Sequence, residues 1–485
     1  MKCEKEPYEA VIGLEIHARL ATNTKLFCGD YNRFGDTPNS LISEISLAHP
    51  GTLPFLNKKA VSFAVKMGIA CHCDITDTTY FARKNYFYPD LPKGYQVTQH
   101  ISPICKNGYV PIRIENEIKD IFLNRIHLEE DAGKSLHDLD DKFSCLDFNR
   151  AGTPLIEIVT EPVLHSAEEA YQFLSEIRRL VKWLDICDGN MEEGSLRCDA
   201  NISIRPKGSK KLGVKVEVKN LNSLRFVKKA IQVEINRLIE LAKKNQQIIQ
   251  ETRSYDATSN TTFPMRDKES ADDYRYFPEP DLPPVKINEG FFSDLKKSMP
   301  ELPSQKEKRY CNEYKLPLLD AERLCAEKQV ACYFDEAVKY STNYKALANL
   351  ITGPLMQYLH EQKSDFSNPV LPANKLEEIV QLIDENKINF SIAASKLLPF
   401  LMTHQNEDVL VAATREGWLQ INDTDELEKW IQMVLDRMPD KVKQYQQGKK
   451  GLIGLMMGEV KKISKGKADP VITIKLLEEK LTKSN

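Results

Sequence analysis

The chain has 485 residues, of which 41% are hydrophobic and 28% are charged, and its formal net charge is −3. This length is too great for one hydrophobic core and suggests about three domains, while the balance of residue types excludes global disorder. No apolar run approaches the ~18 residues that a membrane-spanning helix needs. With so small a net charge, any nucleic-acid contact must come from a local basic patch.

The N-terminal sequence shows no apolar or Arg/Ser-rich targeting segment. Eleven cysteines are scattered without a Cys-x-x-Cys motif, which is typical of reduced thiols. Both features favour a cytoplasmic protein. Cys71 and Cys73 flank His72, but no further ligands stand at a matching spacing, so we expect plain buried thiols there.

The first predicted strand covers residues 12–20 and alternates strictly between apolar and polar positions. Its apolar face holds Ile12, Leu14, Ile16, Ala18 and Leu20, and its other face holds Gly13, Glu15, His17 and Arg19. A sheet with one face in water explains such alternation without any site. However, both residues of the Glu-x-His pair are of types that bind metals, which is unusual for an ordinary solvated face.

A second strand ends in three carboxylates, Glu129, Glu130 and Asp131, followed by Gly133-Lys134-Ser135. The segment is not a P-loop, because the glycine five residues before the Gly-Lys pair is missing. An acidic surface turn is one interpretation. The other is a divalent-metal site with oxygen ligands from Glu15, Glu129 or Glu130 and His17 as the nitrogen ligand, a set that suits Mg²⁺ or Mn²⁺.

The next strand, residues 155–159, carries Glu157 among apolar residues, and a buried carboxylate there needs Arg150, Arg197 or a metal as partner. Ser166 and Glu169 then form a capping box that predicts the start of a helix. Its buried stripe comprises Ala170, Phe173, Leu174, Ile177, Val181 and Leu184.

Two further strands, residues 196–205 and 214–219, are joined by a Pro-Lys-Gly-Ser turn and are expected to pair as a hairpin. Their polar faces carry cations and acids, including Arg197, Asp199 and Lys219. Metal carboxylates that face cations are a recurrent arrangement for nucleotide phosphates, so the pattern indicates a metal- and nucleotide-dependent enzyme. The candidate cations are Arg83, Lys84, Lys93, Arg197, Lys219 and Arg275.

Two aromatic and charged segments, residues 83–95 and 272–281, are typical either of aromatic plugs under long loops or of nucleobase-binding loops. From about residue 294 the pattern becomes helical, as Leu376, Ile379, Val380 and Ile383 show. We therefore predict an α+β chain: a mostly antiparallel sheet domain at 1–293, a helical domain at 294–405 and a small helical tail at 406–485. Nine lysines at 441–475 indicate either a solvated face or contact with a phosphate backbone.

The sequence segments described above are specific enough to indicate a similar family. Together they resemble the family of B subunits of aspartyl/glutamyl-tRNA(Asn/Gln) amidotransferases, the GatB family, in order through the first 280 residues and again in the tail. The matching segments are Val11–His17, Arg83–Asp90, His127–Ser135, Gly152–Val159, Met191–Asn201, Val218–Ser223, Asp272–Pro280 and Lys465–Pro470.

The resemblance implies a ligase, a glutamine-hydrolysing aminoacyl-tRNA amidotransferase, with a glutamine-synthetase-like cradle followed by the helical and tail domains. Such an enzyme uses ATP to phosphorylate the side-chain carboxylate of Glu-tRNA(Gln) or Asp-tRNA(Asn), and ammonia then displaces the phosphate. It implies ATP and Mg²⁺ as cofactors. No amidase or glutaminase constellation is visible here, so ammonia is expected from a partner amidase, the family's A subunit, with the small C subunit completing a heterotrimer.

The resemblance also implies residue roles. Expected metal ligands are Glu15, His17, Glu129 and Glu130, and expected catalytic residues are Glu130, Glu193, Arg197 and Asp199. Expected ATP-binding residues are Lys84, Arg197, Lys219 and Arg275, and expected tRNA-binding residues are Lys449, Lys450, Lys461, Lys465 and Lys467.

One departure from the family concerns zinc. Many relatives carry four cysteines after the first strand, and here only Cys28 remains, so we expect no zinc. The helical region also lacks the large insertion of the archaeal glutamate-only relatives. Two rival functions stay open: a self-contained ligase that uses free ammonia, and a tRNA-binding scaffold whose pocket does not act.

Overall fold

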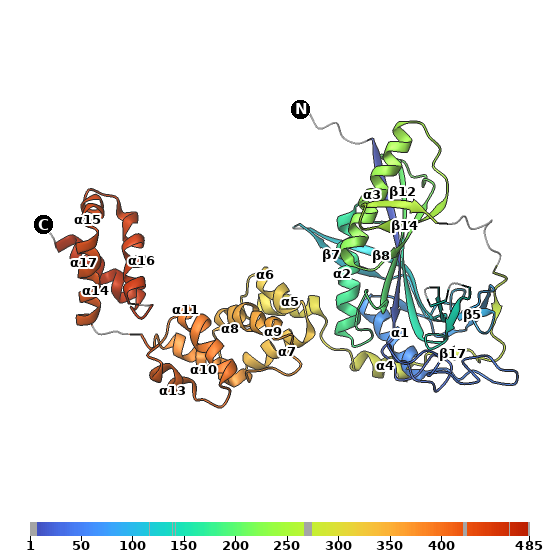
Figure 1. Cartoon of the computed structure of the whole chain (residues 1–485), viewed down its shortest axis with the longest axis horizontal. Coiled ribbons are helices and arrows are strands. Elements are labelled where there is room, and N and C mark those ends of the chain that lie inside the picture. Colours follow the sequence, from blue (N-terminus) through green and yellow to red (C-terminus); the bar gives the residue numbers. More distant parts are fainter. Residues whose placement is uncertain are drawn as a thin grey trace. The chain divides into compact units, whose positions relative to one another are not determined.

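The computed structural model describes residues 7–115, 117–137, 139–140, 142–265, 274–420, 424–464 and 466–483. The chain divides into two compact units, Met1–Leu302 and Pro303–Asn485. The first combines a large sheet with helices, and the second is helical (Figure 1). The α+β expectation is thus confirmed as a mixed α/β unit followed by a helical region.

The first unit holds the strands and four helices that position the site. In chain order they are β1 (Tyr8–Arg19), α1 (Lys58–Ala70), β2 (Asp74–Ile75), β3 (Thr78–Thr79), β4 (Ala82–Asn85), β5 (Tyr95–Thr98), β6 (Cys105–Lys106), β7 (Tyr109–Ile114), β8 (Glu117–Glu130), β9 (Lys134–Leu136), β10 (Cys145–Asp147), β11 (Pro154–Thr160), α2 (Ala167–Trp183), β12 (Leu196–Pro206), β13 (Val216–Leu221), α3 (Leu224–Lys243), β14 (Glu251–Asp256), β15 (Thr261–Pro264), β16 (Phe277–Pro278), β17 (Val285–Lys286) and α4 (Glu289–Lys297).

Thirteen of these strands form one sheet, with the order β15-β14-β13-β12-β1-β11-β8-β5-β4-β16 along its main path. The neighbours on this path run antiparallel, except β13 and β14, which are parallel. That exception follows from the chain: α3 lies between the two strands in sequence, and a helical crossover returns the second strand in the same direction. The predicted hairpin of β12 and β13 is confirmed, with Asn201 opposite Glu217.

The alternation in β1 separates a buried apolar face from a polar one, as predicted. Ile12, Leu14 and Ile16 are completely buried and share one core with residues of α1, α2 and α3. In α2, the Ser166 side chain accepts a hydrogen bond from the amide of Glu169, which confirms the predicted N-cap. Because the helices cover the apolar face, the polar face of the central strands remains available for a functional site.

The second unit begins after α4, whose Phe291, Phe292 and Leu295 pack against the core of the first unit. Trp183 of α2 donates to the carbonyl of Glu301 and so ties the last residues of the first unit to its sheet domain. The division of the chain into three domains, which end at residues 293, 405 and 485, remains a prediction.

The second unit consists of helices, and the predicted amphipathic helix at 376–383 is α10, which buries Leu376, Ile379 and Val380. The elements are α5 (Pro303–Asn312), α6 (Leu318–Leu324), α7 (Lys328–Ala337), α8 (Tyr344–Leu350), η1 (Ile351–Leu355), α9 (Met356–Glu361), α10 (Ala373–Asp384), α11 (Phe390–Ile392), η2 (Ala393–Leu397), α12 (Leu398–Thr403), α13 (Val409–Arg415), α14 (Thr424–Arg437), α15 (Pro439–Gln446), η3 (Lys450–Leu452), α16 (Ile453–Ile463) and α17 (Pro470–Lys483).

Candidate active site

A row of charged and imidazole side chains crosses the polar face of the sheet. In the strand register, His17 of β1 lies opposite Arg197 of β12 on one side and Glu157 of β11 on the other, and Glu157 lies opposite His127 of β8. Directly opposed residues on one face of a sheet have their Cβ atoms ~5 Å apart. The register therefore brings together residues that are far apart in the sequence.

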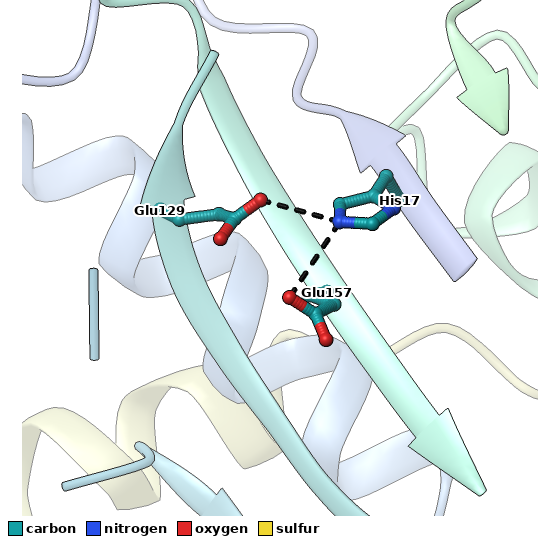
Figure 2. Close-up of side chains that lie close together, drawn as sticks. All are labelled: His17, Glu129 and Glu157. Atoms are coloured by element: carbon teal, nitrogen blue, oxygen red, sulfur yellow. Dashed lines mark ion pairs between the residues drawn. The ribbon is translucent and has the colours of Figure 1, made fainter. Parts of the chain in front are cut away.

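The centre of this row is formed by His17, Glu129 and Glu157 (Figure 2). Nε2 of His17 lies 3.3 Å from Oε1 of Glu129 and 3.5 Å from Oε2 of Glu157. Burial works against a charged imidazole, but the two carboxylates outweigh it and raise the pKa of His17 to about 10. In the same way burial opposes ionisation of Glu129, while the two neighbouring histidines hold its pKa low.

His127 completes this group from the neighbouring strand β8. It is fully buried, its Nε2 lies 3.4 Å from Glu157 and 3.7 Å from Glu129, and neither ring nitrogen has a hydrogen-bond partner among the described residues. Buried polar atoms are normally satisfied, so an unsatisfied imidazole is unusual. Two carboxylates and one or two imidazole nitrogens form a donor set that fits a hard divalent cation such as Mg²⁺ or Mn²⁺.

Glu15 lies beside this group but has a different environment. Its Oε1 accepts a hydrogen bond of 3.0 Å from the side chain of Asn201. Burial, followed by the charges of Glu157, Glu217 and Asp199, raises the pKa of Glu15, and Lys219 partly offsets the effect. The site therefore gathers more negative charge than its nearest lysine balances.

The two main cations of the face are held by acids. The Lys219 ammonium lies 2.7 Å from Asp199 and 2.9 Å from Glu217; burial opposes its charge, but these two acids outweigh burial and raise its pKa. Arg197 donates to Asp131 over 2.8 Å, and this carboxylate is the main reason that the pKa of Arg197 is raised. Both cations are thus fixed and charged before any ligand arrives.

Glu130 points away from the cluster of its neighbour Glu129, because successive residues of a strand face opposite sides. Its carboxylate accepts hydrogen bonds from the amide of Val97, over 2.9 Å, and from the ammonium of Lys93. It lines an open pocket of about 800 Å³ that also includes Lys93, Asp131 and Tyr95. The structure therefore separates the predicted ligands into His17 and Glu129 at the cluster, Glu15 beside it and Glu130 at the pocket.

Comparison with known proteins shows which family this chain belongs to. The model of the GatB/GatE catalytic domain matches residues 10–293, and the model of the GatB domain matches residues 332–481. The B subunit of the aspartyl/glutamyl-tRNA(Asn/Gln) amidotransferase of Thermodesulfovibrio yellowstonii is 46% identical over 97% of this chain and 98% of the relative. Proteins with the same name from Persephonella marina and Caldicellulosiruptor bescii are 44% and 43% identical, each over 98% of this chain and 99% of the relative. The chain belongs to the GatB family.

The family resemblance assigned ATP binding to Lys84 and Arg275, which lie on the two aromatic segments. The structure brings these segments together, since Phe277 of β16 pairs with Arg83 of β4. The Lys84 ammonium lies 4.6 Å from the ring centre of Tyr274, and Arg275 is exposed. Asp272 and Asp273, which the sequence pattern included, lie outside the described residues. His100 stacks on Tyr276 and meets the edge of the His127 ring, which links these loops to the cluster.

Glu193 lies exposed in the turn before β12, where its main-chain amide donates to the side chain of Asn190. Its carboxylate is not part of the cluster of His17, Glu129 and Glu157. Asp199, the other acid expected to be catalytic on this segment, is half-buried and bound to Lys219.

The tail lysines lie in and around η3 and α16. Lys449, Lys450 and Lys461 are exposed, and the Lys450 ammonium lies 4.2 Å from the ring centre of Tyr445. Lys467 is half-buried, and Lys465 lies outside the described residues.

The region after β1 surrounds the single Cys28 with polar groups other than thiols. Its Sγ lies 3.4 Å from the hydroxyl of Ser46, which also donates to Asp30. The buried Lys25 donates to Ser46 over 3.3 Å. Burial raises the pKa of the Cys28 thiol.

Three residues of the site receive no role from the sequence alone. Glu157 stands out there only as a buried acid in need of a partner, His127 only as part of a matching segment, and Asp131 only as the last of three successive carboxylates. The signal for His127 is its alternation with Glu129 on one strand face, and the signal for Glu157 is its position inside an apolar strand.

Among the helices that the structure describes, none is long and apolar enough to span a membrane.

Proposed function

We propose that this chain is the kinase and transamidase component of a tRNA-dependent amidotransferase. It converts misacylated Glu-tRNA(Gln), Asp-tRNA(Asn) or both to the amide forms, as a ligase that consumes ATP. The names of its relatives supply the substrate class. The observation that carries the proposal is the oxygen-rich cluster of His17, Glu129 and Glu157 on the same sheet face as Arg197 and Lys219.

The reaction proceeds in two balanced steps. An oxygen of the substrate's side-chain carboxylate attacks the γ-phosphorus of ATP, which forms an acyl phosphate and releases ADP. Ammonia then attacks the acyl carbon, inorganic phosphate leaves, and a proton passes to a base. A carboxylate is a poor acyl donor, whereas an acyl phosphate carries a good leaving group, which is why ATP is required.

The residues of this chain have separate roles in these steps. His17, Glu129 and Glu157, with Glu15 beside them, would hold Mg²⁺, which would supply charge neutralisation for the phosphates when bound. Arg197 and Lys219, already fixed by Asp131 and Asp199, stabilise the negative charge of the transferring phosphoryl group. Glu130, at the adjoining pocket, accepts the proton released when ammonia attacks.

The expected roles of the outer residues complete the proposal. Lys84 and Arg275 contact the nucleotide from the aromatic loops, Glu193 lines the acyl-acceptor side, and Asp199 keeps Lys219 in place. In the tail, Lys449, Lys450, Lys461, Lys465 and Lys467 bind the tRNA body. The sheet unit acts as a glutamine-synthetase-like cradle, and the region of Cys28 holds no zinc. The amidase, or A subunit, supplies ammonia, and the small C subunit completes a cytoplasmic heterotrimer.

The test uses the chain co-expressed with candidate amidase and small subunits, supplied with glutamine, Mg²⁺ and labelled ATP. Phosphate release that depends on Glu-tRNA, together with the appearance of Gln-tRNA, supports the proposal. Full activity of this chain alone with free ammonia favours the self-contained ligase. Tight tRNA binding without stimulated phosphate release favours the inactive scaffold. Glu130→Ala separates the roles, because it should abolish product formation and leave tRNA affinity nearly unchanged.

A further inference from the structure

An arginine beside the cluster is held at a distance from the carboxylate that carries the opposite charge. Nη2 of Arg125 lies 3.8 Å from Oε1 of Glu157, whereas a hydrogen bond between a guanidinium and a carboxylate is ~2.8 Å long. Only 20% of the Arg125 side chain and 12% of the Glu157 side chain are exposed. Since burial strengthens the attraction between opposite charges, the long separation needs a physical cause.

Two hydrogen bonds fix the guanidinium of Arg125 in this position. Its Nη1 donates to the side-chain oxygen of Asn124 over 2.9 Å, and its Nη2 lies 3.2 Å from Nδ1 of His100. A guanidinium can only donate, so Nδ1 of His100 is the acceptor and the ring proton is on Nε2. Nε of Arg125 is buried and has no hydrogen-bond partner among the described residues. The guanidinium therefore has unused donor capacity, and its hydrogen bond to His100 opposes a shift toward Glu157.

The ring of His100 is itself fixed by two other rings. It stacks on Tyr276 with the ring centres 5.3 Å apart and the planes inclined by 9°, and it meets the ring of His127 at 5.8 Å and 87°. The main-chain amide of His100 donates to the hydroxyl of Thr98 over 3.3 Å. These contacts set the plane of the imidazole, and with it the direction in which Nδ1 accepts a hydrogen bond.

The position of Arg125 matters for Glu157. Oε2 of Glu157 faces the imidazoles of His17, at 3.5 Å, and His127, at 3.4 Å, whereas Oε1 faces Arg125 (Figure 2). We propose that His100 is a positioning residue that holds Arg125 off Oε1 and so leaves this oxygen available to a divalent cation. The inference rests on the proposed function, in which Glu157 is a metal ligand, and extends it to a residue outside the ligand set. Without the acceptor on His100, Arg125 would move to hydrogen-bond distance of Glu157 and compete with the ion.

The test compares two replacements of His100, each of which keeps one feature of the imidazole. His100→Phe keeps a flat ring for Tyr276 but offers Arg125 no acceptor, whereas His100→Asn loses the ring and keeps an acceptor near the position of Nδ1. His100 is exposed, so both chains should fold. Binding of Mn²⁺ to the full-length chain is followed by its paramagnetic signal. We expect His100→Phe to raise the Kd for Mn²⁺ about tenfold and His100→Asn to leave it within about twofold of the parent value.

The variant Arg125→Gln shows whether the effect passes through the guanidinium. If it does, His100→Phe should raise the Kd for Mn²⁺ in the parent chain but not in the Arg125→Gln chain, because the competing charge is gone. Equal weakening in both chains overturns the inference, as does a parental Kd in a folded His100→Phe chain. If His100→Asn weakens binding as much as His100→Phe does, the ring and not the acceptor matters, and the inference is wrong.

Activity of the complex separates this inference from the proposed function. The Mg²⁺ midpoint for phosphate release should rise with His100→Phe, while the KM for Glu-tRNA and the thermal unfolding of the chain stay at the parent values. If the parent chain binds Mn²⁺ but the complex shows no tRNA-dependent phosphate release, the proposed function fails, whereas the binding measurements still decide the role of His100. If the parent chain binds no Mn²⁺, the inference fails together with the metal site.

Discussion

Replacing Glu157 by glutamine removes one negative charge from the centre of the cluster and preserves the shape of the side chain. Oε2 of Glu157 lies 3.5 Å from Nε2 of His17 and 3.4 Å from Nε2 of His127. At an effective dielectric constant of about 20, unit charges 3.5 Å apart interact by about 5 kcal/mol. A divalent ion would interact more strongly with the carboxylate, but it must give up hydration to do so.

Allowing for that hydration, we expect the substitution to weaken Mg²⁺ binding by about 3 kcal/mol, which is roughly a hundredfold. Activity of the complex with Glu-tRNA is measured against free Mg²⁺, and the midpoint should move to higher concentration. Binding of Mn²⁺ to the full-length chain, followed by its paramagnetic signal, gives a measure that does not depend on activity.

The matched control is Glu161→Gln, just after the end of the same strand. Glu161 accepts a hydrogen bond of 2.7 Å from Asn124, which a glutamine oxygen can also accept. Its midpoint for Mg²⁺ should equal that of the parent. If Glu157→Gln binds Mn²⁺ as tightly as the control does, then Glu157 is not a ligand and its role is limited to pairing with the two histidines and Arg125.

Three further predictions address other parts of the chain. Lys219→Ala should lower kcat for phosphate release about a hundredfold without changing tRNA affinity, whereas the exposed Lys228→Ala should leave both unchanged. Combined alanine substitution of Lys449, Lys450 and Lys461 should weaken tRNA binding and reduce its salt dependence by roughly one unit of slope per lysine; an unchanged slope contradicts the tail assignment. Asp335 accepts hydrogen bonds from Lys306, Arg309 and Tyr310, which lower its pKa against the effect of burial, so Asp335→Asn should cost about 1–3 kcal/mol of unfolding free energy at neutral pH. Because the folded pKa is depressed, this difference should be complete above the unfolded value of about 4 and should shrink as the pH falls through the folded value; a difference that stays constant in urea unfolding down to pH 2 contradicts it.

The local parts of the fold could be predicted because they depend on short-range patterns. Strict alternation in β1 and β12 defined the two faces of each strand, since side chains of a strand alternate whatever its neighbours are. The Ser166 cap and the apolar stripe defined α2 for a similar reason. Alternation in β1, β12 and β13 also placed His17, Arg197 and Lys219 on polar faces.

The arrangement of the cluster could not be predicted in this way, because it depends on strand order and register. No short pattern states that β11 lies between β1 and β8, and that order is what puts Glu157 between His17 and His127. The opposite orientation of the Glu129 and Glu130 side chains can be predicted from the sequence, since adjacent strand residues point to opposite sides. Grouping residues 129–131 as three successive acids leaves this difference out.

The charges of this sheet face are compatible with folding because Arg197 and Lys219 are each paired with a carboxylate. Arg197 is bound to Asp131, and Lys219 is bound to Asp199. Burial of isolated charges would cost several kcal/mol each, whereas paired and hydrogen-bonded charges cost far less. The same pairing keeps the cations in position when phosphates arrive, so little reorganisation is needed during transfer. It follows that removing one acid of a pair should impair the position of its cation before it impairs the fold, because the opposite, apolar face of these strands supplies the packing.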